Sequence, residues 1–141
     1  MSMMQNQTPD TAITPILGGD LSGKGPGPTL LTADTLEGNH VHNATGEHLG
    51  KIRDVMIDVP TGRIAYAVMA SGGVMGIGGK LFALPWSALV LDADHHSFIL
   101  DIEKERLENA PGFDKDHWPS TADYTFTQSV YDYYEIPPYW V

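Results

Sequence analysis

The chain contains no cysteine among its 141 residues. Disulfides, thiolate catalysis and cysteine-held zinc or iron–sulfur sites are therefore excluded. The lack of cysteine is compatible with the reducing cytoplasm, where we expect the protein to be located. Hydrophobic residues make up 42% of the chain, which is enough for one compact core.

Basic residues are also scarce. Only 8 Lys and Arg stand against 18 Asp and Glu, which gives a formal net charge of −10 at pH 7. Nucleic-acid-binding proteins draw most of their affinity from phosphate contacts, which require a basic surface. We therefore expect no DNA partner, and the charge disfavours RNA and docking on anionic lipid as well.

Long apolar runs are missing too. No run reaches the roughly 18–20 residues that a membrane-spanning helix needs. Residues 1–10 are polar and have neither a basic region nor an apolar stretch, so we expect no secretory signal. The sequence thus predicts a protein without a transmembrane segment.

Turn-forming residues are abundant instead. The chain contains 15 Gly and 10 Pro, which favour short strands and turns over long helices. Several short apolar segments separated by polar turns are typical of a small all-β barrel or sandwich. We expect strands at residues 39–43, 51–59, 63–70, 80–86 and 97–102, a short turn capped by Thr32 at 32–38, and short helices at 102–110 and 127–134.

The segment Arg63–Ala70 is apolar on both faces. Tyr66 and Val68 share one face of the expected strand, whereas Ala67 and Met69 share the other. A lone antiparallel sheet usually exposes one face to water. We therefore expect a helix, the C-terminal tail or a second subunit to cover the outer face.

The strand expected at residues 51–59 changes the parity of its apolar positions. Ile52 falls on one face, whereas Val55 and Ile57 fall on the other. One extra residue would reconcile the two patterns. We therefore predict a β-bulge near Arg53–Asp54.

The composition divides the chain into three zones. Residues 1–28 are rich in Thr, Gly and Pro, so we expect a flexible N-terminal arm. Residues 29–110 carry the fold. Residues 111–141 contain nine aromatic side chains, which are costly to leave in water. We expect this C-terminal extension to pack on the barrel or on a partner subunit.

Several pieces of residues 30–110 together resemble one known family. They are Leu36–Asn43, Gly46–Ile52, Asp54–Asp58, Gly62–Val68, Leu81–Trp86 and Leu107–Pro111. Their order and spacing resemble the PRC-barrel domain, which also forms the cytoplasmic part of the photosynthetic reaction centre H subunit and the C-terminal half of a bacterial ribosome maturation factor. The resemblance implies a mainly β fold, a small PRC-type barrel of five to six antiparallel strands with one or two short helices and a C-terminal aromatic extension.

The resemblance also implies a class of function. The sequence shows neither the membrane helix of the H subunit nor the additional barrel of the maturation factor, so it is similar to the free-standing bacterial type. We expect a binding or assembly module that forms a homodimer, with a protein partner as a further option. The alternatives are a ribosome-associated or reaction-centre-like accessory factor and a small-ligand or metal sensor.

No set of catalytic residues can be assembled from the sequence. Ser87 and Ser97 lack the G-x-S-x-G context of a nucleophile elbow. Asp54 and Asp58 would lie about 13 Å apart on a strand, further than the paired carboxylates of glycosidases. We therefore expect a protein that is not an enzyme and that carries no cofactor.

A glycine-rich stretch, Gly72–Gly79, precedes Lys80 and superficially matches a phosphate-binding loop. A P-loop continues into a helix with Ser or Thr after its Lys, whereas Lys80 is followed by Leu81. We interpret the stretch as a loop between two strands. The expected contact residues are the apolar side chains at the loop tip and aromatic ones in the tail: Val74, Met75, Ile77, Tyr131, Tyr134 and Trp140.

Six histidines raise the question of a metal site. His40 and His42 share a face of one expected strand. No HExxH motif is present, and a metal site needs three or four convergent ligands. We expect no metal, and the weak candidates for one are Asp92, Asp94, His95 and His96 in a polar turn.

Overall fold

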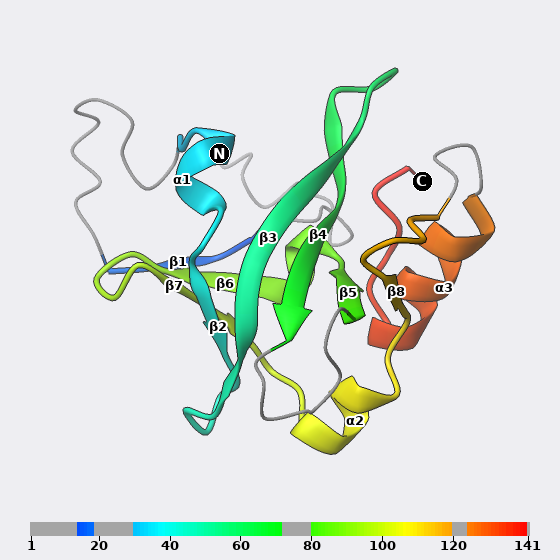
Figure 1. Ribbon diagram of the computed structural model, residues 1–141. Coiled ribbons are helices and arrows are strands. Elements are labelled where there is room, and N and C mark those ends of the chain that lie inside the picture. Colours follow the sequence, from blue (N-terminus) through cyan, green and yellow to red (C-terminus); the bar gives the residue numbers. More distant parts are fainter. Residues whose placement is uncertain (1–13, 19–29, 72–79, 120–123, 141) are drawn as a thin grey trace, which may run out of the picture.

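The computed structural model describes residues 14–18, 30–71, 80–119 and 124–140. Eight strands and three α-helices lie within these ranges, and no helix there is long and apolar enough to cross a membrane (Figure 1). In chain order they are β1 Ile16–Leu17, α1 Ala33–Leu36, β2 His40–His42, β3 His48–Asp58, β4 Arg63–Ser71, β5 Lys80–Leu84, the 3-10 helix η3 Trp86–Ala88, β6 Leu89–Asp92, β7 Ser97–Leu100, α2 Lys104–Glu108, β8 Gly112–Asp114 and α3 Tyr124–Tyr134.

The strands form one mixed sheet with the order β1-β6-β7-β2-β3-β4-β5-β8. Two pairs, β1–β6 and β2–β7, are parallel, and the remaining pairs are antiparallel. The expectation of five to six antiparallel strands is therefore wrong in number and in part in direction. The three strands that were not expected, β1, β6 and β8, are only two to four residues long, too short for a visible period-two pattern.

The connection between β5 and β6 requires the sheet to be strongly curved. Only Pro85–Ala88 separate the two strands, and five steps along the chain span at most about 18 Å. In a flat sheet, the five strand spacings between β6 and β5 would measure about 24 Å. The sheet therefore rolls up, although its edge strands β1 and β8 do not pair with each other in the described part of the chain.

The main core fills the inside of the rolled sheet. Leu107 of α2 closes it on one side with no exposed surface. Every strand from β2 to β7 contributes buried side chains, and the core residues are Leu36, Val41, Leu49, Ile52, Ala67, Met69, Phe82, Leu84, Leu89, Leu91, Phe98, Leu100, Ile102, Leu107 and Ala110.

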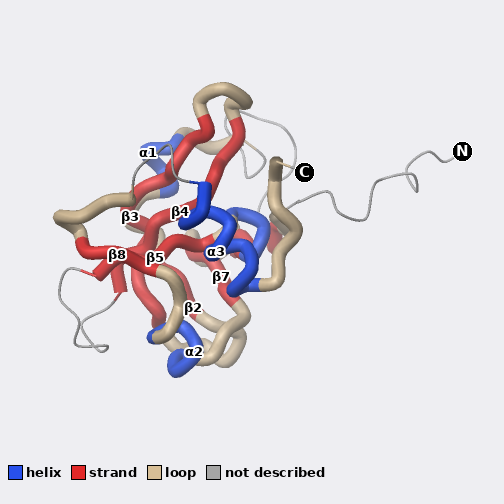
Figure 2. Tube along the Cα trace, turned by 90° about the vertical axis from the view of Figure 1, so that its right-hand side faces the viewer, coloured by secondary structure: helices blue, strands red, loops and turns tan. Residues whose placement is uncertain are grey.

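Helix α3 covers the outer face of β4 and β5 (Figure 2). Val130 and Tyr131 pack there against Tyr66 and Val68, and the Tyr131 hydroxyl donates a 2.7 Å hydrogen bond to the carbonyl of Ala65. The two apolar faces of β4 thus belong to two cores, the inner one and this outer one. The covering layer expected from the sequence is supplied by the chain's own C-terminal part.

Local irregularities of β3 follow the sequence pattern. Its register to β4 shifts between Ile52 and Asp54, which confirms the predicted β-bulge, and shifts again between Met56 and Ile57. The predicted cap is also confirmed, because the Thr32 hydroxyl accepts a hydrogen bond from the Thr35 amide at 3.3 Å.

Shortening Val130 tests the contribution of α3 to stability. Val130 is fully buried in the outer core. We expect Val130→Ala to lower the free energy of unfolding by about 2 kcal/mol, from lost methyl burial and the resulting cavity. Urea denaturation measures this change. The control Ser129→Ala alters an exposed neighbour on the same helix, and an equal loss in both variants would contradict the packing of α3 on the sheet.

Candidate functional site

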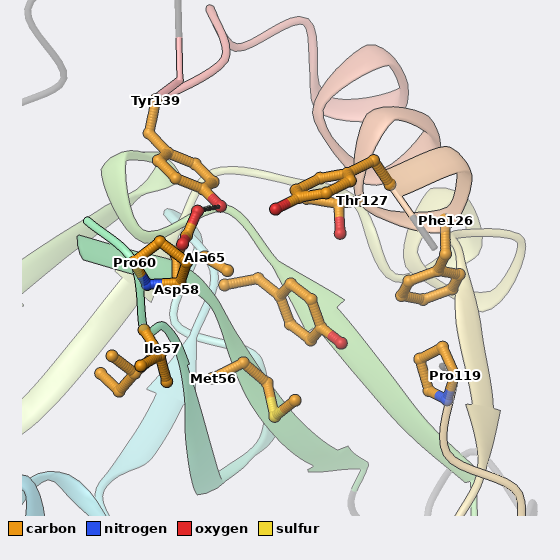
Figure 3. Close-up of a pocket in the computed structure, with 12 residues that line it drawn as sticks. Met56, Ile57, Asp58, Pro60, Ala65, Pro119, Phe126, Thr127 and Tyr139 are labelled. Atoms are coloured by element: carbon orange, nitrogen blue, oxygen red, sulfur yellow. Dashed lines mark hydrogen bonds between the residues drawn. The ribbon is translucent and has the colours of Figure 1, made fainter. Parts of the chain in front are cut away.

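A hollow of about 340 Å³ lies between the β3–β4 hairpin and the C-terminal part of the chain (Figure 3). Figure 3 shows Met56 and Asp58 on the hairpin side and Phe126 and Pro119 across the opening. The lining is mainly apolar and aromatic: Met56, Ile57, Asp58, Val59, Pro60, Ala65, Tyr66, Pro119, Tyr124, Phe126, Thr127 and Tyr139.

The hairpin that forms one wall projects beyond the rest of the sheet (Figure 1). It turns through a short loop in which the Gly62 amide donates to the Asp58 carbonyl at 2.8 Å. Gly62 has a φ of +73°, a conformation that favours glycine. The projecting end exposes large apolar side chains, with Ile57 50% and Val59 81% exposed. Such exposure beside a hollow is typical of a contact surface.

Aromatic rings build the opposite wall. Phe126 of α3 contacts the ring of Tyr66 edge-on, with ring centroids 5.9 Å apart. Beyond α3 the chain returns to the hairpin, where the Tyr139 ring lies 5.9 Å from Tyr131 and 5.0 Å from Trp140. These contacts hold the wall in a fixed shape, because buried aromatic pairs add to the stability gained from burial alone.

Hydrogen bonds join the two walls at one end of the hollow. The Tyr139 hydroxyl donates to Asp58 Oδ2 at 2.6 Å, and the Arg63 guanidinium donates to the Tyr139 carbonyl. Tyr139 is thus bonded to both strands of the hairpin although it lies 81 residues from Asp58 in the sequence. The C-terminal segment closes this end of the hollow.

Burial changes the acidity of the tyrosines around the hollow. Desolvation raises the pKa of Tyr66 to about 12 and raises that of Tyr131 further. For Tyr139 desolvation is again the main cause of a raised pKa, and the hydrogen bond to Asp58 adds to it, because a phenolate would face a carboxylate. These phenols are therefore neutral hydrogen-bond donors at physiological pH.

The lining of the hollow offers little for catalysis. Among the described residues its lining contains no His, Lys, Ser or Cys, and the one charged side chain there, Asp58, accepts the bond from Tyr139. General base catalysis and nucleophilic catalysis both need a group that can take up a proton or attack a substrate. The arrangement suits an apolar or aromatic group that enters the hollow.

The contact residues expected from the sequence fall in different places. Val74, Met75 and Ile77 lie outside the described residues. Tyr131 is only 2% exposed, so its expected role as an exposed contact residue is wrong. Its ring is buried because α3 presents it to the outer face of β4. Tyr134 and Trp140 are partly buried in the aromatic packing.

The weak metal candidates do not form a site. His95 Nδ1 lies 2.8 Å from Asp92 Oδ2, so these two side chains pair with each other. The hydrogen bond to His95 lowers the pKa of Asp92. His96 adopts a φ of +49° in the same turn. Over the described ranges no three His, Cys, Asp or Glu side chains are already arranged to hold a metal ion.

Sequence reasoning missed the residues that define the hollow. Met56 and Tyr139 were not singled out, and Asp58 was considered only as half of a carboxylate pair, because no local motif marks them and Tyr139 reaches the hairpin only through tertiary structure. One available signal was Val59-Pro60, an apolar pair in a predicted turn where polar residues are usual.

The rolled mixed sheet, its inner core and the covering helix α3 define a small, mainly β domain. The family model of the PRC-barrel domain matches residues 28–107, more than half of the chain. The protein therefore belongs to the PRC-barrel family. No curated protein matched the chain. The matched range ends before α3, so the helix and the tail that form one wall of the hollow lie outside it.

Raised tyrosine pKa values predict a loss of stability at high pH. In the unfolded chain a tyrosine loses its proton near pH 10, whereas folded Tyr66 holds it to about 12. Stability is then fully present below pH 10 and falls as the pH rises from about 10 to 12. Urea denaturation between pH 8 and 11 measures this fall. A native protein whose six tyrosines all ionise together near pH 10 would contradict it.

Removing the Tyr139 hydroxyl tests the bond that closes the hollow. We expect Tyr139→Phe to lower the free energy of unfolding by about 1 kcal/mol, because a partly buried hydrogen bond to Asp58 is lost. Tyr134→Phe is the matched control. The Tyr134 hydroxyl is buried without a hydrogen-bond partner among the described residues, so its removal should leave stability unchanged or raise it. Thermal or urea denaturation distinguishes the two, and equal losses would contradict the assignment.

Proposed function

We propose that the chain is a non-catalytic binding and assembly module that acts as a homodimer in the cytoplasm. The observation that carries this proposal is the projecting hairpin, whose exposed Val59 and Ile57 stand beside an aromatic hollow. Exposed apolar side chains cost free energy in water and gain it when a partner covers them. The hairpin end and the hollow together provide a protruding and a concave apolar surface.

Charge constrains how a second copy of the chain uses this surface. Each copy carries a formal net charge of −10, so two copies repel each other, and a contact with few free carboxylates adds least to that repulsion. Asp58 is the one charged side chain among the described residues that line the hollow, and it is bonded to Tyr139. A two-fold interface uses the same patch on both subunits. The hairpin end of each copy would then meet the hollow of the other.

A small apolar ligand is the second candidate. The hollow, at about 340 Å³, lies within the range of small-molecule sites, which starts at about 300 Å³. The ribosome-associated and reaction-centre-like alternatives rest on family resemblance alone.

Sedimentation equilibrium of the full chain at tens of micromolar tests the homodimer. We expect a dimer that Val59→Glu converts to a monomer, because the new charge would be buried without a partner. Thr45→Glu adds the same charge to an exposed position in the β2–β3 turn, outside the hairpin end, and should leave the dimer intact. A wild-type protein that is strictly monomeric at these concentrations would overturn the homodimer. Equal dissociation by both variants would remove the hairpin end from the interface.

A further inference from the structure

Three histidines gather on the outer face of β2 and β3, on the part of the sheet that α3 does not cover. His40 and His42 lie two residues apart on β2, and His48 at the start of β3 pairs with His42 across the ladder. His40 Nδ1 lies 2.8 Å from His48 Nε2. All three side chains retain access to solvent.

The spacing of His48 from each β2 histidine is close to that around a metal ion, whereas His40 and His42 lie further apart and must approach each other to share one. The ring centroids lie 4.9 Å apart for His40 and His48, 5.4 Å for His42 and His48, and 6.2 Å for His40 and His42. Imidazoles that share a tetrahedral zinc ion through bonds of about 2.0–2.1 Å have centroids about 5 Å apart and facing nitrogens about 3.3 Å apart. The facing nitrogens of His40 and His48 need to separate by only about 0.5 Å to match this distance.

The backbone already fixes two of the three positions. Val41 between the two β2 histidines is fully buried, so the alternation of the strand directs both imidazoles outward. On the side of β7, His40 and His42 also line a shallow hollow of about 370 Å³ together with Asp92 and Ser97. This hollow leaves room for water to complete the coordination of an ion.

Burial is the main cause that lowers the pKa of His48, and nearby groups add to it. Burial, the other two histidines, Lys51 and Lys104 all lower the pKa of His48, in that order of size. Lys51 faces His40 directly across the β2–β3 ladder. For His48 the neutral imidazole, which is the form that binds metal, is therefore favoured at neutral pH. The same lysines oppose a bound cation, so a moderate rather than a tight affinity is expected.

We propose that His40, His42 and His48 form a binding site for one divalent transition-metal ion of the zinc class. The ion enters between the facing nitrogens of His40 and His48. One of these two rings donates its N–H to the other. When the ion binds, that ring changes tautomer, so that its proton sits on the nitrogen that faces away from the ion. Both facing nitrogens then offer a lone pair to the ion, and no proton is released to solvent. His42 then turns about its side-chain torsions to supply the third nitrogen, and water completes the tetrahedron.

A calorimetric titration of the full chain with zinc chloride tests this site. We expect one zinc ion per chain and an affinity about tenfold or more weaker in each of His40→Ala, His42→Ala and His48→Ala. His117→Ala changes an exposed histidine beside Asp114 and is the matched control. Binding should also weaken between pH 7 and pH 5.5, because protons compete for the imidazoles.

A measurement on the wild-type protein keeps the proposal testable even if one of these variants fails to fold. Histidine side-chain NMR of the wild-type chain should show that zinc shifts the imidazole signals of His40, His42 and His48 first. Absence of one-to-one binding would overturn the proposal. It would also be overturned if zinc shifted the signals of His95 alone, or if His117→Ala weakened binding as much as His48→Ala.

Discussion

The length of one connection constrains the whole fold. Four residues, Pro85–Ala88, join two strands that are five positions apart in the sheet, and they are too short to cross a flat sheet. The sheet must therefore roll, and rolling separates an inner face from an outer one. The inner face becomes the main core, in which Phe82, Phe98 and Leu107 are fully buried. The outer face is left for other segments to cover or to leave exposed.

The outer face is divided into regions with different chemistry. Over β4 and β5 it is apolar, and α3 covers it through Val130 and Tyr131. Over β2 and the start of β3 it carries histidines that no helix covers. The β3–β4 hairpin end extends beyond the area that α3 covers, and Val59 in its turn remains 81% exposed. The position of α3 on the sheet thus determines where the hollow lies and which apolar residues stay exposed beside it.

Much of this arrangement could be predicted from the sequence, because it depends on local patterns. The two apolar faces of Arg63–Ala70 predicted a covering layer, and the parity change after Ile52 predicted the bulge. The strand directions could not be predicted, because the parallel pairing of β2 with β7 depends on how the sheet rolls rather than on any residue pattern. The hollow escaped prediction for a similar reason, since its closing bond joins residues 81 positions apart.

The bond between Tyr139 and Asp58 connects the shape of the hollow with the proposed burial of the hairpin end by a partner. A carboxylate that a partner buries loses its hydration, and the cost is several kcal/mol unless the protein replaces the lost hydrogen bonds. Tyr139 already supplies one such bond at 2.6 Å and occupies the end of the hollow with its ring. The segment that supplies this bond lies beyond the residues matched by the family model, so the barrel alone would present an unbonded carboxylate to a partner. The C-terminal extension therefore does more than cover the outer face: it makes the hairpin end of the barrel suitable for burial.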